Sequence, residues 1–295
     1  MTDMHDELPH DSITSPANPR LRQAAALRAA DTRRETGLTL VDGRREISLA
    51  IAAGIPLVEL FVAADLLAGD VPRGPADALH GPEPLEPWLR SVAARGTRVT
   101  LLGPRAFDRV AFGSRNEGVV GVVRFGPQPL DRAAFAGERP VLIVEGVEKP
   151  GNLGAILRTS DAAALAGVVV CAGRTDPANP AVIRASLGTL FTVPLAVAGV
   201  AETLAWLRAA GRRVVAATPQ GTRLWHEVRL SGRTAILLGS EAHGISSDWQ
   251  EAAAAGMIDF ESVRLPMLGR ADSLNLSVTA AVLAYESLRQ GGTPA

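Results

Sequence analysis

Three glycine-containing turns carry the residues of this chain that could perform chemistry, and each follows a segment with the apolar pattern of a strand. The first turn, residues 148–158, reads EKPGNLGAILR and contains Asn152, Gly154 and Arg158. Asn152 is placed as the N-cap of a helix, and Gly154 leaves room for a ligand or another backbone to approach. Arg158 comes early enough in that helix to stay near the strand end. The competing interpretation is a surface arginine on an amphipathic helix.

The second turn, residues 237–244, reads LLGSEAHG and leaves an apolar strand directly. Glycines let the backbone curl, and the exposed amides and carbonyls can then hold a polar ligand such as the edge of an adenine. Glu241 is the only carboxylate in this turn. An ordinary strand-to-helix turn remains the alternative. His243 is interpreted as a turn residue, because no partner for a nucleophilic dyad is visible.

The third turn, residues 265–277, reads LPMLGRADSLNLS. Pro266 ends a strand-like segment and Gly269 permits a tight loop. Ser273, Asn275 and Ser277 then place polar atoms at the start of an otherwise apolar helix. Ser273 is a binding candidate, and it could equally be the N-cap of that helix.

Other familiar catalytic patterns are missing from the sequence. It contains no GxxxxGK[ST] phosphate loop, no HExxH pair and no GxSxG elbow. No GxGxxG follows a strand, which argues against a Rossmann-type dinucleotide or methyl-donor site. The five histidines show no metal-ligand spacing, so no metal is expected.

The segments around the turns alternate between strand and helix patterns, which predicts an α/β fold. In the second half of the chain, strands are predicted at residues 141–147, 168–171, 192–197, 213–218, 234–238 and 262–265, and helices at 153–165, 181–190, 202–210 and 274–288. Such alternation predicts a mostly parallel sheet with ligands at the carboxyl ends of its strands. The last helix has the spacing of one buried face at Leu274, Val278, Ala281, Val282, Tyr285 and Leu288.

In the first half of the chain, the sequence patterns predict a smaller α/β unit. Its helical patterns cover residues 21–34, 44–53 and 88–94, and its strand patterns cover 38–41, 57–63, 98–102 and 118–125. The predicted organisation is a disordered tail at 1–13, a small domain at 14–125, a proline-containing linker at 126–140 and a second domain at 141–295.

Composition limits the class of protein. The chain has 295 residues, of which 47% are hydrophobic and 21% charged, and a net charge of −1, so it is neither a disordered chain nor a polycation. Its single cysteine, Cys171, excludes an internal disulfide and favours a reducing cytoplasm. The N-terminus lacks the apolar core of a signal peptide, and no apolar stretch approaches the roughly 20 residues of a membrane span. A cytoplasmic protein without a membrane partner is expected.

Residues 19–45 form a local basic cluster, because this segment contains seven arginines and only three carboxylates. The cluster contains Arg20, Arg22, Arg33 and Arg34. Arginine presents a fixed fork of donors to phosphate oxygens, so the cluster suits a nucleic-acid backbone. A solvated helical face is the alternative.

Together, the three turns resemble the SpoU (TrmH-like) branch of the SPOUT RNA methyltransferases. That family carries NxGxxxR, then a strand ending in GxExxG, then PMxGxxSLNxS. Here the first two elements are Asn152, Gly154 and Arg158, then Gly239, Glu241 and Gly244. The third is Pro266, Met267 and Gly269 followed by Ser273, Leu274, Asn275 and Ser277, with three residues between Gly269 and Ser273. The resemblance spans residues 141–290.

The N-terminal part is similar to the L30e-like substrate-binding domain of many family members, through NPRLR at residues 18–22 and RRETGLTLVDG at 33–43. Antibiotic-resistance ribosomal RNA methyltransferases of the family share this two-domain layout. The resemblance implies a trefoil-knotted C-terminal domain, a homodimer formed through it, and S-adenosylmethionine as methyl donor. Backbone groups of Thr218, Gly239, Leu265 and Leu274 would hold the donor.

The implied reaction is 2′-O-methylation of a ribose. Family proposals cast Arg158 as the base, but arginine is effectively never deprotonated in proteins. Arg158 is therefore expected to bind a phosphate and orient the 2′-hydroxyl, with Asn152, Ser273 and Asn275 shaping the acceptor pocket. Glu241 would orient Arg158 or the motif loop.

Ribosomal RNA is the preferred substrate, because the N-terminal domain resembles a ribosomal-protein-like RNA binder. A transfer RNA methyltransferase and a non-catalytic RNA-binding or ribosome-assembly protein remain the alternatives. The target nucleotide is beyond the sequence.

Overall fold

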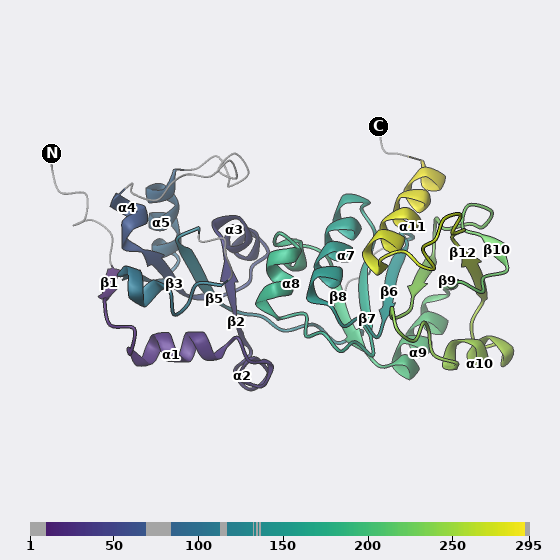
Figure 1. Cartoon of the computed structure of the whole chain (residues 1–295), viewed down its shortest axis with the longest axis horizontal. Helices are drawn as coiled ribbons and strands as arrows, with labels where there is room; N and C mark the ends of the chain where they lie inside the picture. Colours follow the sequence, from purple (N-terminus) through teal and green to yellow (C-terminus); the bar gives the residue numbers. More distant parts are fainter. Residues whose placement is uncertain are drawn as a thin grey trace. The chain divides into compact units, whose positions relative to one another are not determined.

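The structure is a computed structural model that describes residues 10–68, 84–112, 117–131, 133, 135 and 137–292. The chain forms two compact units (Figure 1). Unit 1 comprises Met1–Gly126 and Ala178–Phe191, and unit 2 comprises Pro127–Pro177 and Thr192–Ala295. Among the described residues, no helix is long and apolar enough to cross a membrane.

Unit 1 is built on a five-stranded mixed sheet in the order β1-β4-β3-β5-β2. Its strands are β1 (His10–Ile13), β2 (Leu38–Asp42), β3 (Leu57–Ala63), β4 (Arg98–Leu102) and β5 (Val119–Arg124). Its helices are α1 (Pro19–Ala26), α2 (Ala30–Thr36), α3 (Arg44–Ala52), α4 (Ala64–Ala68), α5 (Leu85–Ala94), α6 (Pro104–Phe107) and α8 (Pro180–Ala185). Leu21, Leu40, Phe61, Leu102 and Phe107 lie in its core.

Three expectations for unit 1 need correction. His10–Ile13 is not part of a tail, because it pairs in parallel with β4 as an edge strand; residues 1–9 of the predicted tail lie outside the described residues. The helix predicted at 21–34 is interrupted, since α1 ends at Ala26 and α2 begins at Ala30. The helix predicted at 88–94 starts earlier than expected, since α5 begins at Leu85.

The segment Ala178–Phe191 belongs to unit 1, although the chain enters and leaves it from unit 2. The backbone oxygen of Ala178 accepts a 2.6 Å hydrogen bond from Oγ1 of Thr39, a buried residue of β2. Arg184 of α8 forms a 3.3 Å ion pair with Asp42 at the end of β2. The helix predicted at 181–190 is therefore α8 followed by a short 3₁₀ turn, and it packs on the small sheet.

Unit 2 is built on a seven-stranded sheet in the order β10-β12-β9-β11-β6-β7-β8, and every recorded strand pair is parallel. Its strands are β6 (Val141–Glu145), β7 (Gly167–Cys171), β8 (Leu195–Ala198), β9 (Arg213–Ala217), β10 (Arg223–Leu224), β11 (Thr234–Leu238) and β12 (Phe260–Arg264). Its helices are α7 (Pro150–Ala162), α9 (Val200–Ala210), α10 (Asp248–Ala254) and α11 (Leu276–Gly291).

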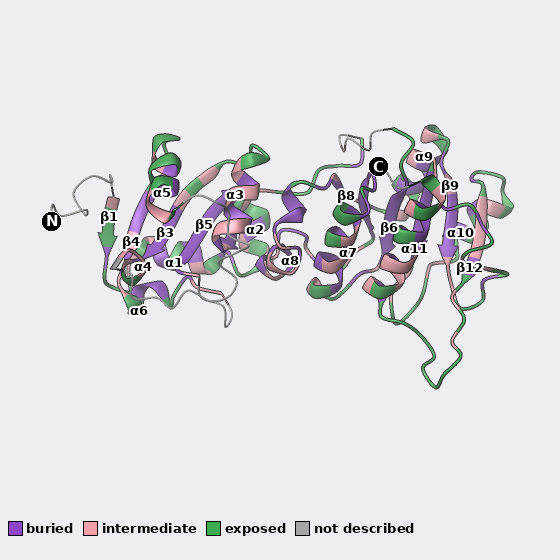
Figure 2. Ribbon diagram, turned by 90° about the horizontal axis from the view of Figure 1, so that it is seen from above, coloured by how far each residue is buried: buried purple, intermediate pink, exposed green. Residues whose placement is uncertain are grey.

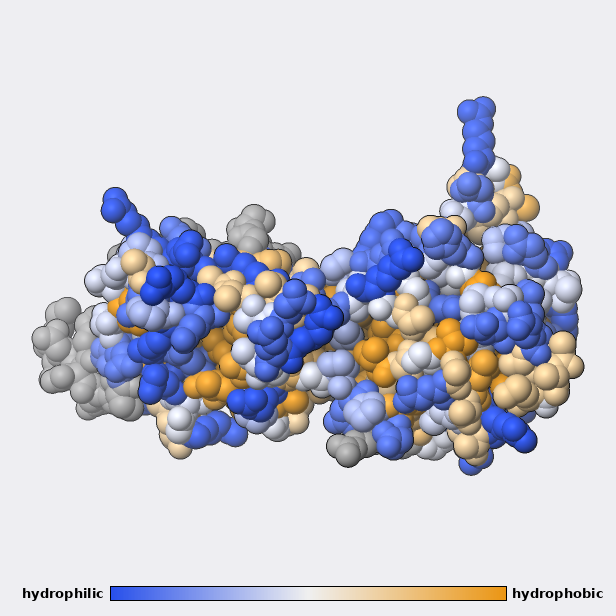
Figure 3. Space-filling view, turned by 90° about the horizontal axis from the view of Figure 1, so that it is seen from below, coloured by the Kyte–Doolittle hydropathy of each residue, from blue (hydrophilic) through white to orange (hydrophobic). Residues whose placement is uncertain are grey.

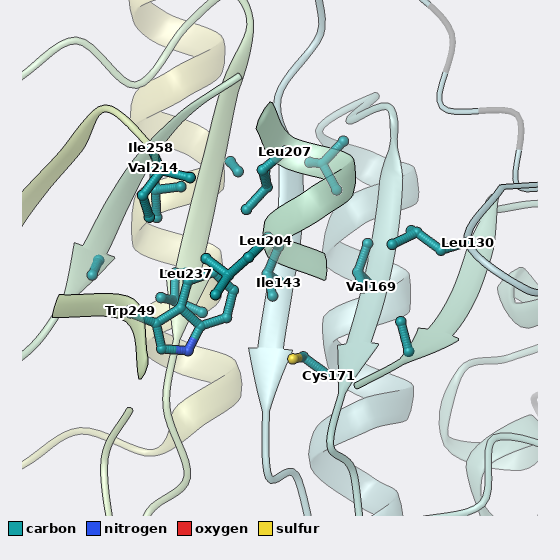
Figure 4. Packing of buried hydrophobic residues seen from close by; sticks show 14 of the residues in the cluster. Leu130, Ile143, Val169, Cys171, Leu204, Leu207, Val214, Leu237, Trp249 and Ile258 are labelled. Carbon is teal, nitrogen blue, oxygen red and sulfur yellow. The ribbon is translucent and has the colours of Figure 1, made fainter. Parts of the chain in front are cut away.

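Helices cover both faces of this sheet. Leu204 and Leu207 of α9 and Trp249 of α10 pack with Ile143 and Leu237 on one face, as Figure 4 shows, whereas α7 and α11 pass behind the strands. A sheet covered on both faces needs strands that are apolar throughout, and β6, β7 and β11 are buried at every position (Figure 2). The predicted mostly parallel α/β architecture is confirmed.

The segment predicted as a linker at 126–140 is tied into unit 2 from Pro127 onward. Leu130 is a buried member of the core of unit 2, and the ring of Phe135 lies 5.3 Å from that of Trp206. Arg212 is also buried, and its guanidinium donates to the backbone oxygens of Arg139 and Gly137. Burial of its guanidinium lowers the pKa of Arg212.

Candidate functional site

Parallel pairing brings the predicted turns to one edge of the sheet in unit 2. Strands β12, β9 and β11 are neighbours, with Val263 opposite Ala217 and Ala217 opposite Leu238. Thr218, Gly239 and Leu265 are the next residues of these three strands, so their backbones lie side by side at the carboxyl end of the sheet. This edge is where ligands of open α/β sheets bind.

Gly239 makes a close backbone approach that no side chain would allow. A Cβ atom at this position would lie 2.1 Å from the carbonyl carbon of Gly244. The turn closes on itself, because the amides of Ser240 and Gly244 each donate to the other residue's carbonyl, at 2.9 and 3.0 Å. Glycine is required here for steric reasons, and the result is a compact backbone loop at the sheet edge.

Asn152 lies in the first turn of α7 but does not cap it. The N-cap residue is Lys149, and Pro150 begins the helix. The predicted cap is therefore wrong, because Pro150 suits the first helical position and starts the helix earlier than expected. Because the Asn152 side chain does not cap the helix, it is available for other contacts. The side chain is buried, and its Nδ2 donates to Oε1 of Glu241 over 2.8 Å.

Asn275, rather than Ser273, caps helix α11. Its Oδ1 accepts from the amide and the hydroxyl of Ser277, at 2.9 and 2.7 Å. Its Nδ2 donates to Oδ1 of Asn152 over 3.1 Å and to Oε1 of Glu241 over 3.4 Å. One side chain thus starts the helix and binds both other motifs. Ser273 is exposed, and its hydroxyl donates to Oδ1 of the neighbouring Asp272 over 3.4 Å.

Glu241 is the centre of this polar network. Besides the two asparagine amides, its Oε2 accepts from the ammonium of Lys149. The Lys149 hydrogen bond, followed by that of Asn152, holds the pKa of Glu241 below its ordinary value. The carboxylate therefore stays ionised and acts as an acceptor that joins three separate segments. Lys149 was not predicted as a site residue; its place directly before the Pro150 that starts α7 was the available signal.

Arg158 is not part of this network. Its side chain is exposed and makes no hydrogen bond or ion pair with any residue that the structure describes. On an α-helix, two side chains six residues apart point about 120° away from each other around the helix axis, so Arg158 does not share the face of Asn152. Glu241 therefore does not orient Arg158 through a hydrogen bond or ion pair among the described residues. Glu241 does bind the first and third motif segments, through Asn152 and Asn275.

Leu274 lies in the connection from β12 to α11, which is an exposed loop (Figure 2). In Figure 3 this loop projects from the surface, with hydrophilic residues at its outer end and hydrophobic ones below. Leu268 within it is 96% exposed, and Leu274 is 40% exposed.

The predicted buried face of α11 is wrong for this chain by itself. Leu274, Val278 and Tyr285 are 40%, 46% and 52% exposed. The helix instead buries Leu276, Ala280, Leu283 and Ala284, the face that includes its small residues and packs against α7. The helix therefore has two apolar faces, and packing among the described residues covers one of them.

The four predicted RNA-binding arginines of unit 1 differ in their surroundings. Arg33 is buried and donates to the backbone oxygens of Leu27 and Arg28 at the end of α1. Arg20 is bound by Asp11, Glu59 and Thr100. Arg34 is exposed and pairs with Asp31, whereas Arg22 is exposed with no hydrogen bond or ion pair to the described residues.

No cluster of potential metal ligands occurs among the described residues.

Comparison with known proteins agrees with this geometry. Residues 139–285 match the SpoU rRNA methylase family model. The 23S rRNA (guanosine-2′-O-)-methyltransferase RlmB of Bordetella pertussis is 34% identical over 211 residues, which cover 70% of this chain and 84% of the relative.

Two solved structures extend the likeness over both units. The crystal structure of an RNA 2′-O ribose methyltransferase has 32% identity and a TM-score of 0.75, covering 95% of this chain and 99% of that one. An AdoMet-bound rRNA methyltransferase from Sinorhizobium meliloti has 26% identity and a TM-score of 0.80, covering 95% and 97%. The resemblance seen in the three turns is confirmed: the chain belongs to the SpoU rRNA methylase family.

Proposed function

We propose that this protein transfers a methyl group from S-adenosylmethionine to the 2′-hydroxyl of a ribose in ribosomal RNA. The observation that carries the proposal is the convergence of Asn152, Glu241 and Asn275 beside the strand-end backbone of Thr218, Gly239 and Leu265. Relatives with ribosomal RNA methyltransferase activity in their names support the substrate class.

The methyl donor is proposed to bind at the carboxyl end of β9, β11 and β12. Backbone amides and carbonyls of Thr218, Gly239, Leu265 and Leu274 would hold it. The residues present fit such a ligand. The turn at Gly239 is too tight to accommodate a Cβ atom, and its backbone amides and carbonyls lie at the sheet edge, where a polar ligand can bind them. When bound, S-adenosylmethionine supplies an electrophilic methyl group on a positively charged sulfur.

Arg158 is proposed to bind the RNA phosphate next to the reacting ribose and to orient the 2′-hydroxyl. Its guanidinium makes no hydrogen bond or ion pair with the described residues, so binding a phosphate breaks no such contact with them. Arginine stays protonated, so its contribution is positioning and charge stabilisation rather than proton removal. Ser273 and Asn275, together with Asn152, would shape the acceptor pocket.

A homodimer through unit 2 is part of this proposal. Val278 and Tyr285 expose apolar side chains on one face of α11, and Leu274 and Leu268 expose theirs in the loop that precedes this helix. A second copy of the chain that covers these exposed apolar residues would also bring its own motif residues close to those of the first copy. Arg158 could then contact residues of the partner copy. A trefoil knot in unit 2 remains an expectation from the family.

RNA recognition is proposed to use unit 1, with Arg22 and Arg34 as the contacts to phosphate. The internal contacts of Arg20 and Arg33 give these two a structural part in unit 1. A cytoplasmic location is part of the same proposal. The experiment below distinguishes this proposal from two alternatives, which are methylation of transfer RNA and a non-catalytic RNA-binding role.

The test is transfer of labelled methyl from S-adenosylmethionine to unmodified ribosomal and transfer RNA, with nucleoside digestion of the product. Wild type should place label in a 2′-O-methyl nucleoside of ribosomal RNA. Arg158→Ala should lose about 100-fold or more in rate, in the range for removal of a key electrostatic group, with unchanged thermal stability. Arg208→Ala, an exposed arginine on α9, is the matched control and should be active.

Label in transfer RNA alone would establish the first alternative. Absence of both labelling and donor binding would establish the scaffold. An Arg158→Ala variant that transfers at the wild-type rate would remove Arg158 from the site.

A further inference from the structure

We propose that Lys149 is a positioning residue of the methyl-donor site, which holds Glu241 in place so that the Gly239–Gly244 turn stays closed at the sheet edge. The inference rests on the proposed function and names a residue outside the three motifs. Lys149 is the only lysine in the chain, and its ammonium contacts the carboxylate at the centre of the network.

The two oxygens of Glu241 have separate partners. Oε1 accepts from Asn152 at 2.8 Å and from Asn275 at 3.4 Å, and Oε2 accepts from Lys149. The backbone of Leu276 also hydrogen-bonds the carboxylate. A carboxylate held at both oxygens cannot rotate about its last torsion without breaking one of these contacts. Lys149 therefore keeps Oε1 directed at the two asparagines.

The start of α7 places Lys149 where it can make this contact. It is the N-cap residue of α7, with φ −88° and ψ 121°, and its side chain makes no capping hydrogen bond. The ammonium can reach across to the second motif, while Pro150 fixes the direction in which the helix leaves. The position of the lysine is thus set by the same turn that places Asn152.

Movement of Glu241 would move the turn as a whole. Residues 240–244 are joined by the paired backbone hydrogen bonds of Ser240 and Gly244, and the amide of His243 donates to Oγ of Ser240 over 3.0 Å. Gly239, proposed to hold the donor, begins this closed turn. A carboxylate anchored by Lys149 therefore fixes a backbone segment of the binding site.

Charge contributes as well as geometry. The hydrogen bond from Lys149 is the largest cause that lowers the pKa of Glu241. Removing the ammonium lets that pKa rise, so the network would lose its ionised acceptor at a higher pH. Other charged or titratable groups nearby in the chain are His243 in the turn, Glu148 paired with Arg174 before α7, and Asp272 in the loop before α11.

The experiment measures S-adenosylmethionine binding by calorimetry from about pH 3.5 to pH 8, a range that extends below the ordinary pKa of a glutamate because the pKa of Glu241 is lowered. Thermal unfolding is recorded for each variant at each pH. Lys149→Met should bind about fivefold more weakly at pH 7, near the upper range for an exposed ion pair. Its binding should also fall at a higher pH than that of wild type. Lys149→Arg should recover binding to within about twofold of wild type, because it restores the cation.

Arg174→Met is the matched control. Arg174 is 69% exposed, like the 66% exposed Lys149, and it forms a 2.9 Å ion pair with Glu148, the residue next to Lys149. This variant should bind the donor as wild type does. In a Glu241→Gln background, Lys149→Met should add no further loss, since the charge it holds is already gone.

Wild-type binding by Lys149→Met at every pH would overturn the inference, as would an equal loss in Arg174→Met or no recovery in Lys149→Arg. In each of these outcomes wild type still binds the donor, so the proposed function stands. A wild-type protein that does not bind S-adenosylmethionine would instead contradict the proposed function itself.

Discussion

Asn275 and Asn152 are 123 positions apart in the chain, yet Nδ2 of one lies 3.1 Å from Oδ1 of the other. The same Asn275 side chain caps α11, and the same Asn152 side chain binds Glu241. Formation of α11 and assembly of the site therefore depend on one another.

Asn275 allows its two roles to be separated. Asn275→Ser keeps a capping oxygen but loses the amide that reaches Asn152 and Glu241, so methyl transfer should fall at least tenfold while the midpoint of thermal unfolding changes little. Asn275→Ala should lose transfer and also about 1 kcal/mol of stability, the typical value of an N-cap. Full activity in the serine variant would show that capping is the sole role of Asn275.

Gly239 should not tolerate a side chain. In Gly239→Ala, the new Cβ atom would meet the backbone of Gly244 at 2.1 Å, and the turn must open. We expect a loss of about 1–3 kcal/mol in the free energy of unfolding of unit 2 and weaker donor binding. Gly151→Ala, where the added atom meets nothing within 4 Å, is the control and should be neutral or slightly stabilising. Denaturant titration and calorimetry distinguish the two.

The exposed stripe on α11 should control association. Tyr285→Glu changes a side chain that is 52% exposed in the single chain, so the folded monomer should persist while the dimer dissociates. Light scattering coupled to size-exclusion chromatography measures the mass. Met257→Glu, at a residue that is 41% exposed in the same unit, should leave the mass unchanged. A wild-type monomer, or a dimeric Tyr285→Glu variant, would contradict the proposed interface.

Asp42 should give unit 1 a distinct dependence on pH. Burial is the main reason that the pKa of Asp42 rises from 3.8 to about 7; Glu117 and Glu46 raise it further, while Arg184 and the Phe112 backbone oppose the rise. The folded state then holds a proton that the unfolded state has lost, so this residue makes unit 1 less stable as pH rises from about 4 to 7.

Asp42→Asn removes that titration. The stability of the variant relative to wild type should therefore increase across the same range and level off above pH 7. Denaturant unfolding at several pH values measures the difference, in which the contributions of other groups cancel. Parallel curves for the two proteins would mean that Asp42 keeps an ordinary pKa.

Substitution of Arg22 should affect RNA binding, whereas substitution of Arg33 should affect the stability of unit 1. Arg22→Ala removes an exposed guanidinium and should weaken RNA binding and its salt dependence while leaving the unfolding midpoint unchanged. Arg33→Ala removes a buried guanidinium that donates to two carbonyls at the end of α1, so it should destabilise unit 1 by about 1–3 kcal/mol. Equal loss of RNA affinity in a fully stable Arg33→Ala variant would contradict this division.

The sequence by itself determined the elements and the motifs. Strands at 57–63, 98–102 and 234–238 were predicted with the bounds that the structure has, because β-branched and aliphatic runs reflect local burial. The three turns were also visible, since glycine, proline and asparagine act on the backbone within a few residues. Their order and types were sufficient to indicate the family.

Only the tertiary structure decided how these parts meet. The fold shows that Asn275 rather than Ser273 caps α11, and that Asn152 binds Glu241, which reaches both asparagines from another strand end. The two apolar faces of α11 look alike in sequence, and packing against α7 selects one of them. The segment Ala178–Phe191 packs on unit 1 through contacts with residues about 140 positions earlier, such as Thr39 and Asp42. Local patterns carry no record of such long-range partners, because the free energy that selects them exists only once the chain has folded.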